Sequence, residues 1–212
     1  MFRVEDLREE VREPFVGMAV IAEFPCKCRI CEKGTQKLVE MGREPRTTKR
    51  VHIVIKPLEK YERHQHAWYN ESKLIWSALG AFTVALNKLI GFTPKSKSPE
   101  EQWKEVKTFV EGKVFQWESV KPAEFVSKVL QKPIPKNLPA NLKDAREVWI
   151  PVKIVSNKEL EALGIVGDLK ELHKKFAEEW KREIEEMTEE EVEELSVSGN
   201  EEEWDLKDIL SV

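Results

Sequence analysis

The hydrophobic positions of this chain fall into four short runs that predict β-strands. The runs cover residues 15–24, 51–55, 114–120 and 148–155, and each is rich in Val, Ile or aromatic side chains, as strands usually are. Pro151 interrupts the last run and removes one backbone donor, so we expect this strand at the edge of a sheet. The pattern predicts a body that is mainly β.

Two longer patterns predict helices. Residues 74–90 are apolar nearly all round and are followed by Gly91, which is typical of a buried helix, and Ser72 is its expected N-cap. From Leu169 to Met187 an apolar residue recurs every three or four positions, which predicts an amphipathic helix.

Capping signals set the bounds of the C-terminal helix. Asp168 precedes its first turn, and Thr188 followed by Glu191 has the form of a capping box, so a further helical turn is expected to restart there. Residues 196–203 have no apolar period and are expected to be flexible.

The other segments are expected to be loops or short helices. Residues 25–49 form a Lys/Arg-rich excursion between the first two strands. His64 and His66 are placed in a polar loop before the buried helix, and the Pro-rich residues 121–146 are expected to hold a short helix and a loop. The chain is therefore divided into a helical arm (1–13), a β body (14–155), an amphipathic helical extension (156–187) and an acidic C-terminal tail (188–212).

Charge separates the body from the C-terminal part. Residues 155–212 hold 7 Lys/Arg and 19 Asp/Glu, a net charge of −12, whereas the other residues hold 28 and 20, a net charge of +8. A basic body with aromatic residues is typical of nucleic-acid-binding proteins. An acidic segment in the same chain can compete for the basic surface or bind a separate protein partner.

Composition excludes several classes of protein. No run of about 18 apolar residues occurs, so no membrane span is expected, and the charged N-terminus lacks the apolar stretch of a secretory signal. Three Cys are too few for a disulfide scaffold, which favours a cytoplasmic protein with reduced thiols or a metal site. The 35% of charged residues, mostly Lys and Glu, resembles the composition of hyperthermophile proteins.

Basic residues concentrate on the first two strands and on the excursion between them. Contacts from such a surface to phosphates would provide affinity without sequence preference, and nearby aromatic residues could stack on bases. The expected nucleic-acid-binding residues are Lys27, Arg29, Lys33, Lys37, Arg43, Arg46, Lys49, Arg50, Lys56, Arg63, Trp68, Tyr69 and Trp117. The tryptophans could equally pack into the hydrophobic core.

The three cysteines form a C-x-C-x-x-C run, at Cys26, Cys28 and Cys31. Two thiolates two residues apart can bind one tetrahedral zinc ion. The fourth ligand of such a structural zinc would come from His52, His64 or His66. The alternative is a group of free, reduced thiols at the end of a strand.

No catalytic motif accompanies these residues. The sequence contains no P-loop, no G-x-G-x-x-G, no H-E-x-x-H and no G-x-S-x-G. We therefore expect a binding protein rather than an enzyme.

Five segments carry a resemblance to a known family: PFVGMAVIAEF, KRVHIVIKPL, SKLIWSALGAFTVALNKLIGF, FVEGKVFQWESV and VWIPVKIV. They are predicted in turn as strand, strand, buried helix, strand and strand, with the basic excursion between the first two. With the acidic, hydrophobic-ended C-terminus, they resemble OB-fold single-stranded-DNA-binding-like proteins of archaeal viruses and plasmids. The resemblance implies an α+β fold with a mainly β body, namely an OB-like Greek-key barrel with a buried helix and a C-terminal amphipathic helix.

Two functions follow from these patterns. The first is sequence-tolerant binding of single-stranded nucleic acid in replication or recombination, with an acidic tail that regulates binding or recruits a protein partner. The alternative is a protein-interaction or assembly module that forms a homodimer through the apolar stripe of residues 169–187 and does not bind nucleic acid.

Overall fold

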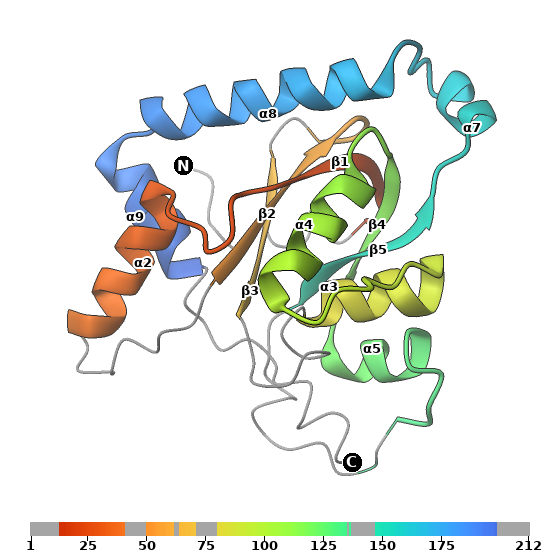
Figure 1. Ribbon diagram of the computed structural model, residues 1–212, viewed down its shortest axis with the longest axis horizontal. Helices are drawn as coiled ribbons and strands as arrows, with labels where there is room; N and C mark the ends of the chain where they lie inside the picture. The colour runs from red at the N-terminus through yellow and green to blue at the C-terminus, as the bar shows by residue number, and fades with distance from the viewer. Residues whose placement is uncertain are drawn as a thin grey trace.

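A five-stranded antiparallel sheet lies at the centre of the computed structural model, which describes residues 13–40, 50–61, 64–70, 80–134, 136 and 147–198. The strand order is β3-β2-β1-β4-β5 (Figure 1). The strands are β1 (Phe15–Ile21), β2 (Arg50–Pro57), β3 (Gln65–Asn70), β4 (Phe115–Val120) and β5 (Val148–Ile154).

Both faces of the sheet are buried, which explains why its strands read as nearly continuous apolar runs. Neighbouring residues of a strand point to opposite faces. On β1, Phe15 and Ala19 belong to one hydrophobic cluster, whereas Met18 and Val20 belong to a second cluster. The sheet therefore has two separate cores, one on each face.

The first core is covered by helices between and after the strands. They are α3 (Gly80–Ala85), the π-helical turn η1 (Leu86–Ile90), α4 (Pro99–Val110) and α5 (Pro122–Lys128). The rings of Trp103 and Trp117 are each nearly parallel to the ring of Phe82, with centroid distances of 6.3 and 6.0 Å. This aromatic group fixes α3 and α4 against the sheet.

The second core is covered by the acidic C-terminal helices. After α7 (Asn157–Ala162), the long helix α8 (Leu169–Glu186) runs across this face, and α9 (Glu189–Ser198) then packs beside α2 (Arg29–Glu40) (Figure 1). Phe176, Trp180 and Ile184 of α8 are buried in the same cluster as Met18 and Val54. The apolar stripe of α8 thus faces the chain's own sheet.

Several predictions from the sequence are confirmed. The four predicted strands are present, and β5 lies at an edge of the sheet. The side chain of Asp168 accepts hydrogen bonds from the first turn of α8, and Thr188 and Glu191 form the expected capping box. Gly91, with φ of 79°, ends the buried helix. The fold class is α+β.

Other predictions were wrong. The excursion between the first two strands contains α2, and the predicted polar loop with His64 and His66 includes strand β3. Helix α4 was not predicted, although Ser98 accepts a hydrogen bond at its N-terminus and Pro99 begins it, both of which are start signals. The predicted acidic tail begins with α9, which packs on α2.

The OB-like barrel is not confirmed. The sheet is open, and β3 and β5 are its two edges. Most of the predicted N-terminal arm, and the tail beyond residue 198, lie outside the described residues.

Candidate functional site

The three cysteines and one histidine form a cluster at one corner of the sheet. One ligand atom from each of Cys26, Cys28, Cys31 and His52 lies within 4.8 Å of every other. The Sγ of Cys28 is 3.4 Å from the Nδ1 of His52. Of the three histidines considered from the sequence, His52 therefore completes the set.

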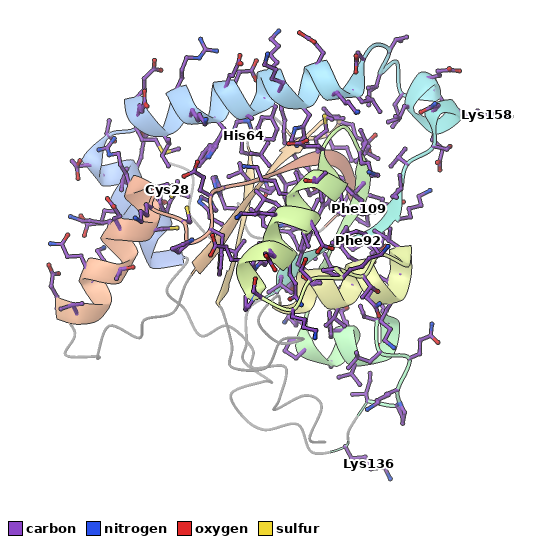
Figure 2. All side chains as sticks on the ribbon, in the orientation of Figure 1. Cys28, His64, Phe92, Phe109, Lys136 and Lys158 are labelled. Atoms are coloured by element: carbon purple, nitrogen blue, oxygen red, sulfur yellow. The ribbon has the colours of Figure 1, made fainter. Side chains whose placement is uncertain are left out.

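These four residues come from the loop after β1, the first turn of α2 and strand β2. The segment between β1 and α2, residues 22–28, carries Cys26 and Cys28, and Cys31 lies in the first turn of α2. The backbone N–H of Glu32 donates to the carbonyl of Cys28, so Cys28 lies at the helix N-terminus. His52 is held beside this segment because its carbonyl accepts from the N–H of Ala22 at 3.0 Å. In Figure 2, Cys28 lies where the chain enters α2.

The thiols perturb one another strongly. Hydrogen bonds from Cys26 and Cys31, and then from His52, lower the pKa of Cys28 far below its ordinary value. The hydrogen bond to Cys28 raises the pKa of Cys26 to about 12, and hydrogen bonds to both neighbours raise the pKa of Cys31. One thiolate is thus stabilised by two S–H donors, an arrangement in which a divalent cation can replace the protons.

The donor set fits zinc. Three sulfurs and one imidazole nitrogen are typical of tetrahedral structural zinc sites. With Zn–S bonds of about 2.3 Å, tetrahedral geometry separates two sulfurs by about 3.8 Å, which the mutual limit of 4.8 Å accommodates.

A second group of residues orients His52. Its Nε2 lies 3.1 Å from the Nδ1 of His66, and the edge of Trp180 contacts its ring at a centroid distance of 5.6 Å. Burial, with the neighbouring His52 and His64, lowers the pKa of His66 to about 3. The Nδ1 of His52 faces Cys28, so a metal ion bound at this nitrogen would leave the ring proton on Nε2, with Nδ1 of His66 as its acceptor.

The other predicted histidine ligand lies elsewhere. The Nδ1 of His64 is 2.8 Å from Glu183 of α8, and its ring contacts Phe176 at a centroid distance of 5.1 Å. His64 is therefore part of the contact between the sheet and α8 (Figure 2).

Three of the predicted nucleic-acid-binding residues are paired with the acidic helices. Arg29 lies 2.5 Å from Glu189, Lys37 lies 2.8 Å from Glu193, and Lys56 lies 2.6 Å from Glu179. Lys37 first, and Lys33 more weakly, lower the pKa of Glu193. The face of β2 that carries Lys56 is covered by α8. These cations bind carboxylates of the same chain.

Lys33 lies in α2, close enough to Glu193 to lower its pKa, and Lys27 lines the pocket described below. The other predicted residues fall into three groups. Trp117 is fully buried and its Nε1 donates to the carbonyl of Gly17 at 3.1 Å, so the prediction that it stacks on bases was wrong. Arg50, Trp68 and Tyr69 lie in β2 and β3, and only their backbone is described. Outside the described residues lie Arg43, Arg46, Lys49 and Arg63.

Beside the cysteine cluster lies a pocket that was not predicted from the sequence. Its volume is about 600 Å³, and it lies between the segment after β1, the C-terminal end of α4 and one side of α8. Five lysines line it, namely Lys27, Lys107, Lys170, Lys174 and Lys181. We call it the lysine pocket. Only Lys27 was among the predicted binding residues, because the other four come from distant helices.

Comparison with known proteins gives no relative from which a function could be transferred: no family model, curated protein or solved structure matches the chain. Within the described ranges, no helix is long and apolar enough to cross a membrane.

Proposed function

We propose that this chain is a sequence-tolerant single-stranded nucleic-acid-binding protein whose corner between β1, α2 and β2 is stabilised by one structural zinc ion. The observation that carries this proposal is the lysine pocket, where five cations from three separate segments converge beside the cysteine cluster. Converging cations are the main source of affinity for phosphates, and this affinity does not depend on base sequence.

The zinc ion is assigned a structural role. Cys26, Cys28, Cys31 and His52 supply four protein ligands, and such a closed set leaves no position for a water molecule or a substrate. The ion would fix the start of α2 against β2, and Lys27 lies between two of its ligands. We therefore propose binding rather than catalysis as the activity of the chain.

Strand order supports the OB-like part of the proposal. Pairing of β3 with β5, the two edges of the sheet, would convert it into a five-stranded barrel. A buried helix, α3 with η1, precedes the fourth strand, as the resemblance to OB-fold proteins implies. One face of the sheet is covered by α8, so we place the nucleic acid beside α8 rather than on the strands.

Helix α9 is proposed to regulate nucleic-acid binding. Glu189 and Glu193 of α9 bind Arg29 and Lys37 of α2. A polyanion approaching α2 would compete with these carboxylates, so α9 is proposed to limit non-specific binding.

The zinc assignment is tested by metal analysis of protein purified without added metal. We expect one zinc ion per chain in the wild type, and loss of zinc in Cys28→Ser and in His52→Ala. His64→Gln is the matched control, because this histidine is not one of the four ligands, and it should keep its zinc. Zinc-free wild-type protein, or full zinc content in His52→Ala, would contradict the assignment.

Nucleic-acid binding is tested by titrating labelled oligo-dT at several salt concentrations. The logarithm of the association constant should fall linearly with the logarithm of the salt concentration, by about 0.7 for each phosphate contacted. No binding at low salt, or a slope near zero, would refute the proposed function.

A further inference from the structure

The lysine pocket has the size of a site for a small ligand. Its volume of about 600 Å³ lies within the range of about 300–1,000 Å³ that is usual for ligand sites. Rigid elements form its walls, since β1, α4 and α8 all take part in the two cores of the sheet. The pocket is therefore preformed.

Its charge favours an anion. Five lysines face two glutamates, Glu23 and Glu111, around the pocket. In contrast to Arg29, Lys37 and Lys56, none of the five lysines forms an ion pair within the part of the chain that the structure describes. Their positive charge is thus available to a ligand with a phosphate group.

The inner wall favours a ring system beside the phosphate. Val20, Val110, Ala177, Trp180 and Ile184 make it mostly apolar, and aromatic and aliphatic walls of this kind bind the faces of bases. Inorganic phosphate would leave this apolar surface uncovered. The ligand therefore combines an anionic group with a flat, weakly polar one.

A buried histidine adds one polar contact to this wall. His173 is only 8% exposed, and its Nε2 lies 2.8 Å from the carbonyl of Ala19. Because a carbonyl only accepts, Nε2 donates in this contact, and in the tautomer with its proton on Nε2 the Nδ1 atom is an acceptor for a ligand. Base amino groups and sugar hydroxyls are donors of the required kind.

We propose that the lysine pocket binds one nucleotide unit, with its phosphate between the lysines and its base against the apolar wall near Trp180 and His173. The same chemistry is present in a free nucleotide and in one unit of a single strand. This proposal rests on the proposed function where the unit belongs to a strand, and the free nucleotide tests the pocket independently.

The test is calorimetric titration of the full chain with adenosine monophosphate, with oligo-dT of about 12 nucleotides and with inorganic phosphate. Lys174→Glu, within the pocket, should weaken binding of the nucleotide and the oligonucleotide about tenfold or more, the effect of one charge-assisted contact. Lys175→Glu is the matched control, because it makes the same charge change on the same helix outside the pocket, and it should change both affinities by less than about twofold.

A second variant fills the proposed base-binding part of the pocket and leaves the net charge of the protein unchanged. Ala177→Phe places a ring in the pocket and should abolish nucleotide binding while circular dichroism and thermal unfolding show a folded protein. If adenosine monophosphate and oligo-dT both bind the two variants as they bind the wild type, the pocket proposal is overturned and the proposed function stands.

The remaining outcomes are equally decisive. Binding of adenosine monophosphate to the wild type but not to Ala177→Phe, without any binding of oligo-dT, supports the pocket and overturns the proposed function. Equal affinity for inorganic phosphate and adenosine monophosphate overturns the pocket proposal, because the base would then contribute nothing.

Discussion

The guanidinium of Arg29 donates a hydrogen bond to the carboxylate of Glu189 over 2.5 Å, although 160 residues separate the two along the chain. The same guanidinium donates to the carbonyl of Met187 at 2.9 Å, where α8 ends and its carbonyls attract cations. In the sequence Arg29 lies between Cys28 and Cys31 of the cysteine cluster. Hydrogen bonds from Arg29 thus hold the start of α9 against α2, next to the candidate zinc site.

Neutralising the two α9 carboxylates that bind α2 should strengthen nucleic-acid binding. In Glu189→Gln/Glu193→Gln, Arg29 and Lys37 lose their carboxylate partners, so their positive charges are no longer neutralised and can attract phosphates. Affinity for oligo-dT at low salt should rise, and the log–log salt slope should steepen by about 1.4, since each phosphate contact contributes about 0.7. Fluorescence anisotropy at several salt concentrations measures both quantities.

The control for this experiment is a second double variant that has the same net charge as the first. Glu190→Gln/Glu194→Gln changes two exposed carboxylates of the same helix and should leave the slope unchanged. Equal strengthening by both double variants would show that total charge, rather than the contact of α9 with α2, controls binding.

Removing the partner of His52 should weaken the metal site without removing a ligand. His66 lies 3.1 Å from the Nε2 of His52, and loss of such an outer contact typically lowers metal affinity by about 10- to 100-fold. Competition of His66→Ala with a chromophoric zinc chelator measures the loss. His64→Gln should compete as the wild type does, and an unchanged affinity in His66→Ala would contradict the assigned orientation of His52.

The pair of Lys56 and Glu179 should stabilise the protein only above an acid threshold. The hydrogen bond from Lys56, with the nearby charges of Lys56, Lys175 and Arg182, lowers the pKa of Glu179 below its ordinary value of 4.5. Its contribution is therefore complete above pH 4.5 and is lost as the pH falls through the lower pKa of the folded state.

Urea unfolding of the wild type and Glu179→Gln at several pH values measures this contribution. The difference in the free energy of unfolding should be constant near neutral pH and should disappear in the acid range. Glu178→Gln, at an exposed neighbouring position, should show no such dependence. A difference that persists at low pH would mean that the glutamine disturbs packing instead.

Truncating the apolar stripe of α8 should destabilise the monomer. Phe176 is 1% exposed and belongs to the chain's own second core, so Phe176→Ala should lower the free energy of unfolding by about 3–5 kcal/mol. Light scattering should give the same mass for the wild type and for the variant while it is folded. A wild-type dimer that dissociates on this substitution would instead support association through α8.

The sequence predicted those elements whose pattern is local. Strands β1, β2, β4 and β5 and helix α8 have apolar runs or a clear helical period. Strand β3 was missed because its polar histidine, His66, faces the buried contact with His52 and Trp180, so burial does not appear as hydrophobicity. Helix α2 was missed because its lysines, cysteine and glycine read as an irregular basic segment.

The candidate site could be predicted only in part for the same reason. The spacing of Cys26, Cys28 and Cys31 indicated a metal site, but the choice of His52 depends on the pairing of β2 with β1, in which Ala22 binds the carbonyl of His52. The lysine pocket depends on the placement of α4 and α8 against β1. Contacts between residues that are 100 or more positions apart in the sequence leave no trace in a local sequence pattern.

The two oppositely charged parts of this chain share one hydrophobic core, because α8 completes the second core of the sheet. A fragment that ends near residue 155 would expose Met18, Val20 and Val54 of the sheet, all at most 8% exposed in the whole chain, and an open apolar face of this kind leads to aggregation. Helix α8, although acidic on its exposed face, is therefore a necessary structural layer, and it cannot be exchanged or removed as an independent module.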